Sequence, residues 1–559
     1  MNAHAHALTV FAPLPVPKSA RPLWQRLTAT ALAASLLAQP WGLAWAQSPG
    51  AAVNTPATAS AAPVGASLPL ASGNLPGLGD GSDMSIADER RLGDSIARQL
   101  YQDPDYLDDP VLVDYLQAIW RPLLAAGRAR GEVPPELSER LAWELLINRV
   151  KEVNAFALPG GYMGVNLGLI AVTESPEELA SVLAHEMSHV SQRHIARMIA
   201  RQQRDAPWLM GAMILGALAA RNNVDVANAA IAGSQALAVQ NQLNFSRDME
   251  READRVGFGV LTDAGFEGRG FVNMFDKLQQ ASRLNDDGAF PYLRSHPLTS
   301  ERIADMHARL PLAGAASANA PVGPLRTAAV TPRLDTGVSR TLHTLMAARA
   351  RVLADSAPDR WQAWLGAGQA TSAPLGDRYA AALSALRLSQ YPLALKLAQA
   401  LRDTVPAEGV QAADALLIDI LVATPQGGQD PRLAALRDKA LAGDSRAQLL
   451  MGAQAALASG APRAAAGPLQ SWVVSHPRDA LAWQTLSRVQ AANGQRLRSV
   501  RSEAEARAAV MDYEGAAARF RAAQALPAAD RQADAMELAI VDVRRREVEA
   551  QQKALEQPR

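Results

Sequence analysis

The sequence predicts a mainly α protein in two parts, an α+β domain with a short β-sheet followed by a C-terminal α-solenoid. The first part is predicted by a capped helix that starts after Ser175 and by two strand-like runs just before it. The second part is predicted because, from Ser339 on, the chain is rich in alanine and leucine, with helical periodicity and no strand-like runs. Segments rich in helix-breaking residues set the expected limits: domains at 85–310 and 339–559, and linkers at 47–84 and 311–338.

The helix after Ser175 carries the most informative motif. Ser175 is the expected N-cap, Pro176 takes the first helical position, and Glu178 stands where a capping box has its glutamate. About three turns further on, the run VLAHEMSHV places His185 and His189 four residues apart. Both imidazoles should therefore lie on one face of a stable helix.

His185, Glu186 and His189 form an H-E-x-x-H motif. Two imidazoles one turn apart can share a metal ion, and the glutamate beside them can take a proton from a water molecule. This is the chemistry of a zinc-dependent peptidase of the zincin type. The alternative is a helix that happens to carry two surface histidines.

A catalytic zinc site usually takes a third protein ligand and keeps one position for water. His194 is close in the sequence, but the extended motif would need glycine and histidine where this chain has Gln192 and Ile195. We therefore expect His194 to be a polar residue that flanks the helix.

Glu250 is a better third ligand. It lies four residues before Asp254 in the run NFSRDMEREADRVGFGVL, so the two carboxylates share a helix face. Glu250 is expected to bind the metal, and Asp254 to accept the free N–H of a ligating histidine. The alternative is a solvated helix of mixed charge. Small residues would let this helix pack closely on the first one: Ala253, Val256, Gly257 and Val260.

The segment before the motif helix predicts a β-hairpin. Residues 154–158 and 162–167 are short and mostly apolar, and Pro159, Gly160 and Gly161 separate them. If the outer edge of this hairpin lies over the metal, an extended substrate could add to it as a further strand. The alternative is an ordinary core hairpin.

Taken together, these residues resemble the zinc metallopeptidases that include the CAAX-prenyl endopeptidases and the heat-shock membrane protease. Members pair H-E-x-x-H with a later E-x-x-x-D, and the strings NAFALPGGYMGVNLGLI and RSHPLTSERIADM also match. The resemblance covers about residues 85–310 and implies one zinc ion per chain. It implies these roles: zinc ligands His185, His189 and Glu250; catalytic base Glu186; and Asp254 as a nearby acid and candidate proton donor.

His296, in the run Ser295-His296-Pro297, has three possible roles. It could be a fourth metal ligand that keeps the enzyme latent, a donor to the tetrahedral oxyanion, or a turn residue. The resemblance favours the first role, because a loop histidine can occupy the water position in related periplasmic proteases.

The N-terminus predicts export to the periplasm. Lys18, Arg21 and Arg26 precede an apolar stretch at 27–38, and the run AWA before Gln47 suits signal-peptide cleavage, so residues 1–46 are the expected signal peptide. A retained inner-membrane anchor is the alternative. The absence of cysteine fits an oxidising compartment.

The remaining features bear on partners. With 55 basic and 55 acidic residues the chain has no basic field for nucleic acid, so nucleic-acid binding is not expected. The apolar segment 207–220 is too short to span a membrane and is either a lid, a surface that makes peripheral membrane or partner contact, or a buried helix.

The C-terminal half shows degenerate spacing of the 34-residue tetratricopeptide (TPR) repeat. Stacked helix pairs form a concave surface suited to binding proteins, whereas the alternative is an irregular helical bundle. The matching positions are Ala394, Leu401 and Pro406; Ala465, Trp472 and Pro477; and Ala516, Phe520, Ala523 and Pro527.

The sequence as a whole predicts an exported zinc endopeptidase joined to a TPR-type solenoid. The layout resembles periplasmic members of the family, which implies that the substrates are unfolded or misassembled outer-membrane proteins and that the solenoid docks on their assembly machinery. The rival hypothesis is a chaperone or assembly adaptor whose zinc site is latent or vestigial.

Overall fold

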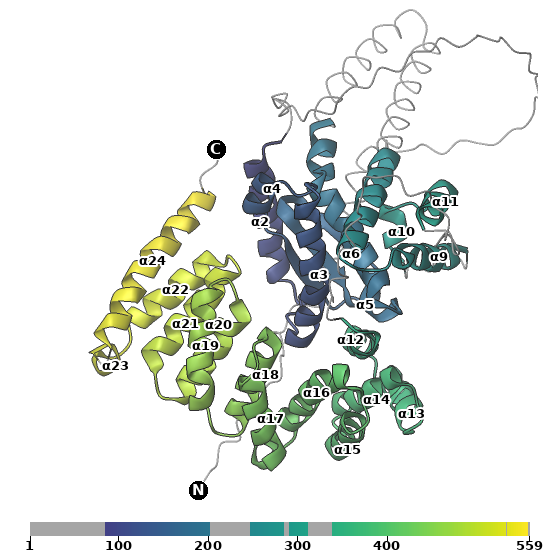
Figure 1. Ribbon diagram of the computed structural model, residues 1–559. Coiled ribbons are helices and arrows are strands. Elements are labelled where there is room, and N and C mark those ends of the chain that lie inside the picture. The colour runs from purple at the N-terminus through teal and green to yellow at the C-terminus, as the bar shows by residue number, and fades with distance from the viewer. Residues whose placement is uncertain (1–83, 202–245, 284–289, 311–337, 533, 557–559) are drawn as a thin grey trace, which may run out of the picture.

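The computed structural model confirms the mainly α fold class with one small sheet (Figure 1). It describes residues 84–201, 246–283, 290–310, 338–532 and 534–556. The predicted signal peptide, both predicted linkers and the apolar segment 207–220 lie outside these ranges, apart from residue 84 and residue 338. Among the described helices, none has the length and apolar character needed to cross a bilayer.

The first three described helices belong to the N-terminal part of the structure. α2 spans Ile86–Tyr101, α3 spans Pro110–Ala129 and α4 spans Pro135–Arg140. Asp109 caps α3 by accepting the N–H of Leu112 at 2.9 Å. The inward face of α3 is apolar and fully buried around Ile119, Trp120 and Leu123, so this helix anchors the core.

A three-stranded sheet lies next in the chain, in the order β1-β3-β2. β1 (Glu144–Asn148) runs parallel to β3 (Tyr162–Asn166), and β2 (Ala155–Leu158) is antiparallel to β3. β2 and β3 form the predicted hairpin, joined by a 3₁₀ turn at Pro159–Gly161. Two glycines suit this turn because Gly160 and Gly161 have φ of 76° and 85°. β2 is therefore an edge strand of the sheet.

The helices that carry the polar motifs follow the sheet in the chain. α5 spans Leu167–Val172 and α6 spans Pro176–Ser191, and α6 contacts both β2 and α3. Further helices cover 194–201 and 246–263. They are followed by α9 (Arg269–Arg283), α10 (Tyr292–Ser295) and α11 (Ser300–Arg309).

The C-terminal half consists of helices that pack mostly on their neighbours in the chain and curve in an arc around the N-terminal part (Figure 1). The expected repeat positions are largely buried, including Ala394, Leu401, Ala465, Ala516 and Phe520. The TPR assignment itself stays a prediction. The helices are α12 (Arg340–Ala354), α13 (Pro358–Gly368), α14 (Leu375–Arg387), α15 (Tyr391–Arg402), α16 (Val410–Ala423), α17 (Pro431–Leu441), α18 (Arg446–Ala458), α19 (Arg463–Ser475), α20 (Ala480–Ala492), α21 (Arg496–Ala509), α22 (Tyr513–Gln524), α23 (Ala528–Gln532) and α24 (Ala535–Glu556).

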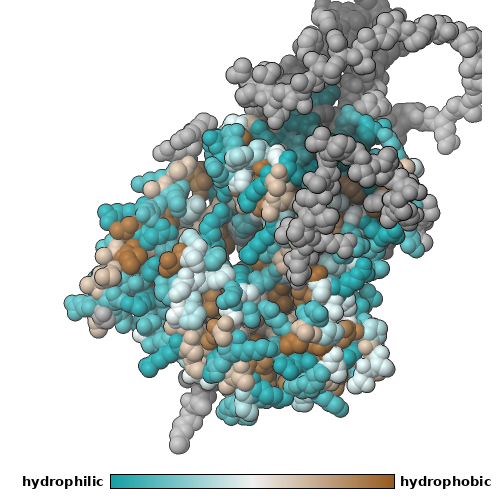
Figure 2. Space-filling model, viewed as in Figure 1, coloured by the Kyte–Doolittle hydropathy of each residue, from teal (hydrophilic) through white to brown (hydrophobic). Residues whose placement is uncertain are grey.

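The two parts share a core. One apolar cluster runs without interruption from Val111 in α3 to Ala455 in α18, and α12 packs against α5 and α3. A cavity of about 1010 Å³ remains between α3 and helices α16 to α19, and none of the motif residues lines it. On the face shown in Figure 2, the surface is mostly hydrophilic with small, separate apolar patches.

Candidate metal centre

α6 places the H-E-x-x-H motif on a buried, rigid helix. Ser175 is the N-cap and accepts the N–H of Glu178, as predicted. The Glu178 carboxylate, however, accepts the N–H of Glu174 at 2.9 Å, one residue before the position a capping box would use. His185 and Glu186 are no more than 1% exposed, so the motif faces the interior.

The second acidic motif reaches the first through a close helix contact. A Cβ on Gly257 would lie 3.1 Å from the backbone of Ala184 and His185, so glycine lets the helix 246–263 approach more closely than a residue with a side chain would without a small shift. The result is that Glu250 faces both imidazoles. Its Oε2 lies 3.4 Å from Nε2 of His185, and its Oε1 lies 3.5 Å from Nε2 of His189.

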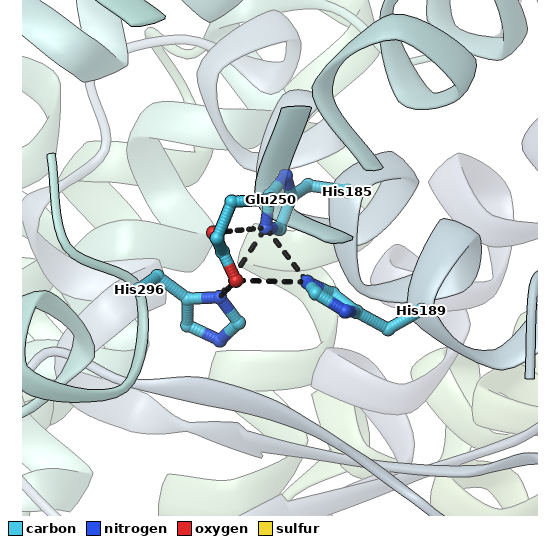
Figure 3. Close-up of side chains that lie close together, drawn as sticks. All are labelled: His185, His189, Glu250 and His296. Atoms are coloured by element: carbon cyan, nitrogen blue, oxygen red, sulfur yellow. Dashed lines mark hydrogen bonds and ion pairs between the residues drawn. The ribbon is translucent and has the colours of Figure 1, made fainter. Parts of the chain in front are cut away.

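His296, the C-cap of α10, completes the group (Figure 3). Its Nδ1 is 2.9 Å from Glu250 Oε1 and 3.3 Å from Nε2 of His185. On its other side, Nε2 is 3.3 Å from Oε1 of Glu186. His296 thus lies between Glu186 and the other three side chains, and it is not an isolated turn residue.

The four side chains have the spacing of a tetrahedral metal site. The ligand atoms of His185, His189, Glu250 and His296 all lie within 4.8 Å of one another. The contacts between them, drawn as dashed lines in Figure 3, measure 2.9 to 3.5 Å. In a tetrahedron with metal–ligand bonds of 2.0–2.1 Å, neighbouring donors are about 3.3 Å apart. Three imidazoles and one carboxylate at this spacing fit a divalent ion such as zinc.

The Asp254 carboxylate contacts the ring nitrogen of His185 that faces away from the donor cluster, and the Arg302 guanidinium contacts that carboxylate. Asp254 Oδ1 is 3.0 Å from Nδ1 of His185, which matches the expected placement of Asp254. Arg302, which no sequence motif predicted for the site, donates two hydrogen bonds to Asp254 at 2.6 and 2.8 Å and contacts Glu250 at 2.9 Å. Its only sequence signal is its place in the run RSHPLTSERIADM, which follows the acidic motif.

His194 follows the end of α6 and is not one of the four clustered donors, in line with the expectation of a helix-flanking polar residue. Its burial is not predicted, because it is 2% exposed and contacts His189. Five residues would carry it off the ligand face of a continuous helix. The chain instead breaks at Arg193, whose φ is 53°, and the new helix returns His194 toward His189.

Burial and neighbouring carboxylates act differently on the two motif histidines. Burial opposes a charge on His185, but Asp254 and Glu250 together raise its pKa to about 10. Burial dominates at His189 and places its pKa well below the ordinary value. Burial also raises the pKa of Glu186, whose Oε2 accepts the N–H of Ala157 on the edge strand β2 at 2.9 Å.

These shifts predict that metal affinity rises with pH. In the metal-free protein His185 has a pKa of about 10 and is therefore protonated at neutral pH, so metal binding must displace that proton. Between about pH 6 and 8 the apparent zinc association constant should therefore rise about tenfold per pH unit. Calorimetry in buffers of different ionisation enthalpy should count about one released proton. An affinity independent of pH would contradict a protonated His185.

The fold and this site define a metallopeptidase: a buried H-E-x-x-H helix, an acidic ligand from a second helix and a small sheet whose edge strand contacts the motif glutamate. Residues 133–310 match peptidase family M48. This stretch of the chain is therefore similar to the metallopeptidases of that family, and it contains all four clustered donors.

Similar proteins have related names. The chain is 33% identical over 237 residues to the beta-barrel assembly-enhancing protease of Yersinia pestis, covering 42% of this chain and 47% of that protein. It is 28% identical over 438 residues to the protein of the same name in Escherichia coli, covering 77% of this chain and 83% of that one. It is 33% identical over 164 residues to the mitochondrial metalloendopeptidase OMA1 of Arabidopsis thaliana, covering 29% and 31%. The match with the Yersinia protein thus spans about half of that protein's length.

Proposed function

We propose that this protein is an exported zinc endopeptidase that hydrolyses misfolded or misassembled outer-membrane proteins in the periplasm. The observation that carries the proposal is the convergence of His185, His189 and Glu250, with Glu186 beside them. The names of the relatives support a role at β-barrel assembly. The predicted signal peptide supports the location.

In this proposal each site residue has one task. His185, His189 and Glu250 hold zinc, which when bound supplies a Lewis acid for the scissile carbonyl and lowers the pKa of water. Glu186 takes the proton of the attacking water and passes it to the leaving amine. A raised pKa suits a residue that must both accept and return a proton. Asp254 accepts from Nδ1 of His185 and orients its ring.

Substrate would bind at the outer edge of β2. Within the described sheet β2 pairs only with β3, and its Ala157 N–H already points to Glu186. An extended chain that adds to this edge is bound through main-chain groups, so many sequences are accepted. Such tolerance is what a protease for unfolded chains needs.

The helical half would dock on the outer-membrane assembly machinery. Support comes from its arc shape in Figure 1 and from the cavity of about 1010 Å³ between α3 and helices α16 to α19. The cavity is lined by both polar and apolar side chains, among them Asp114, Arg121, Leu145 and Met451, as expected for a surface that binds proteins.

A second candidate function rests on His296. Because its Nδ1 already lies among the other donors, the fourth position is filled by a side chain of the protein itself. A site closed in this way suits a chaperone or adaptor that binds unfolded proteins without cutting them until His296 moves away.

The Glu186→Gln variant separates these functions. We expect it to retain wild-type zinc content and to degrade an unfolded outer-membrane protein about 10²–10⁴ times more slowly, because it lacks the general base. Degradation would be followed on gels with purified full-length proteins. Equal rates would exclude the proposed hydrolysis.

If neither the wild type nor the Glu186→Gln variant cleaves the substrate but both bind it, the result supports the chaperone function. The His296→Ala variant then decides between a latent site and a vestigial one. Cleavage by this variant alone would show that His296 blocks a competent site.

A further inference from the structure

His194 lies behind His189, on the side away from the cluster of metal-binding donors. Its side chain is 3% exposed, and its Nδ1 is 2.8 Å from Nδ1 of His189. Its other nitrogen, Nε2, is 3.0 Å from Oε2 of Glu252. Arg197 in turn donates to the same Glu252 oxygen at 2.9 Å, so the carboxylate is held from two sides.

Only one proton arrangement satisfies these contacts when His189 is a ligand. Nε2 of His189 faces Nε2 of His185 at 3.0 Å and Glu250 at 3.5 Å, so Nε2 is the ligand atom. A neutral imidazole that binds through Nε2 carries its proton on Nδ1. That N–H points at Nδ1 of His194, which must accept it. His194 then carries its own proton on Nε2 and donates it to Glu252.

The backbone holds His194 in this place. α6 ends at Ser191, and the left-handed Arg193, with φ of 53°, turns the chain before the next helix. Arg193 is fixed by its Nε contact of 2.8 Å to Glu89, which is 2% exposed. The turn is therefore anchored to α2 by an ion pair whose carboxylate is buried and whose guanidinium is partly exposed, and this contact limits the movement of His194 away from His189.

We propose that His194 is a positioning residue that fixes the tautomer and ring orientation of His189, with Glu252 as its anchor. The inference rests on the proposed metal site and adds a residue to it. The two motif histidines then have different supports: His185 is backed by the charged pair Asp254 and Arg302, whereas His189 is backed by another imidazole. Such outer partners typically contribute about 10–100-fold to metal affinity.

Three substitutions in the full-length protein test this role: His194→Ala, His194→Asn and His194→Gln. The asparagine oxygen is bonded to Cγ, as Nδ1 of histidine is, so it can still accept from His189. The longer glutamine places its polar atoms one bond further out. We expect alanine and glutamine to weaken zinc binding about 10–100-fold, and asparagine to restore most of it. His307→Ala is the control, because His307 lies in α11 with its side chain 51% exposed.

Affinity would be measured by competition with a chelator, and the ligand field by the visible spectrum of the cobalt-substituted protein. A changed cobalt spectrum in the alanine variant supports positioning, because a purely structural loss leaves it unaltered. Thermal unfolding of the metal-free proteins shows whether each variant folds. If alanine does not fold, the comparison of asparagine with glutamine still decides, because both are polar.

The inference is overturned if all three variants bind zinc like the wild type with the same cobalt spectrum, or if asparagine is no better than alanine. In either case a wild type that binds zinc tightly leaves the proposed function standing. A wild type that takes up no zinc would instead remove both the proposed function and the role of His194.

Discussion

The Arg302→Met variant should lower the free energy of unfolding of the metal-free protein by about 3–5 kcal/mol, because it removes a buried guanidinium from two buried carboxylates and leaves them only the protonated His185 as a cation. The Arg302 side chain is 5% exposed and contacts Asp254 at 2.6 Å and Glu250 at 2.9 Å. Its Nη1 also donates to the carbonyl of Pro297 at 2.8 Å, next to His296. One guanidinium thus connects the acidic motif to the loop that carries the fourth donor.

Urea unfolding in the presence of a chelator would measure this loss. The matched control is Arg309→Met in the same helix, where the ion pair with Asp305 is partly exposed and should contribute less than about 1 kcal/mol. A loss in Arg302→Met no larger than in this control would contradict the structural role of Arg302.

The pH dependence of this loss follows from the carboxylates. Burial would raise the pKa of Asp254 and Glu250, but Arg302 and His185 at Asp254, and the histidines at Glu250, hold both below their ordinary values. Their contribution to stability is therefore present above the unfolded-state pKa near 4 and is lost as pH falls through the folded values. In the variant this contribution is reduced, so the difference in stability should be largest near pH 7 and should shrink toward pH 3.

Arg302 also shows why part of the site could not be predicted. The H-E-x-x-H motif, the N-cap at Ser175 and the E-x-x-x-D spacing are local patterns, because helix geometry alone decides which side chains share a face. The β2–β3 hairpin is local as well, since Pro159 and two glycines separate its strands. These features were open to sequence reasoning.

The remaining features depend on contacts between distant residues. β1 is a run of five residues whose partner, β3, begins 18 positions after β1 does, and no turn signal announces a parallel pair. His194 returns to His189 only because the backbone reverses at Arg193. The packing of α12 on α5 joins segments that the expected linker at 311–338 separates. Hydrophobic periodicity predicts which face of a helix is buried, but it does not predict which other element packs against that face.

The junction between the two parts gives the second large prediction, at Arg349 in α12. Its Nη2 is 2.7 Å from Asp109, the N-cap of α3, and its Nη1 is 2.9 Å from Asp419 in α16. The side chains of Arg349 and Asp109 are 5% and 9% exposed, so this contact is shielded from water, whereas Asp419 is 21% exposed and its contact is partly shielded. Burial raises the pKa of Asp419 despite Arg349, so we expect the loss of its partner to be unfavourable for this carboxylate.

The Arg349→Met variant should therefore lose about 3–5 kcal/mol of stability, and hydrogen exchange should speed up in both α3 and α16. Adding Asp109→Asn should recover part of the loss, because asparagine still caps α3 and removes one unpaired charge. The control is Arg432→Met, whose ion pair with Asp430 is local and whose side chain is 44% exposed. If faster exchange stayed within the C-terminal helices, Arg349 would not connect the two parts. Faster exchange in both α3 and α16 would mean that the helical half stabilises α3, which anchors the N-terminal core. Binding of a partner to the helical half would then change the stability of the half that carries the metal site.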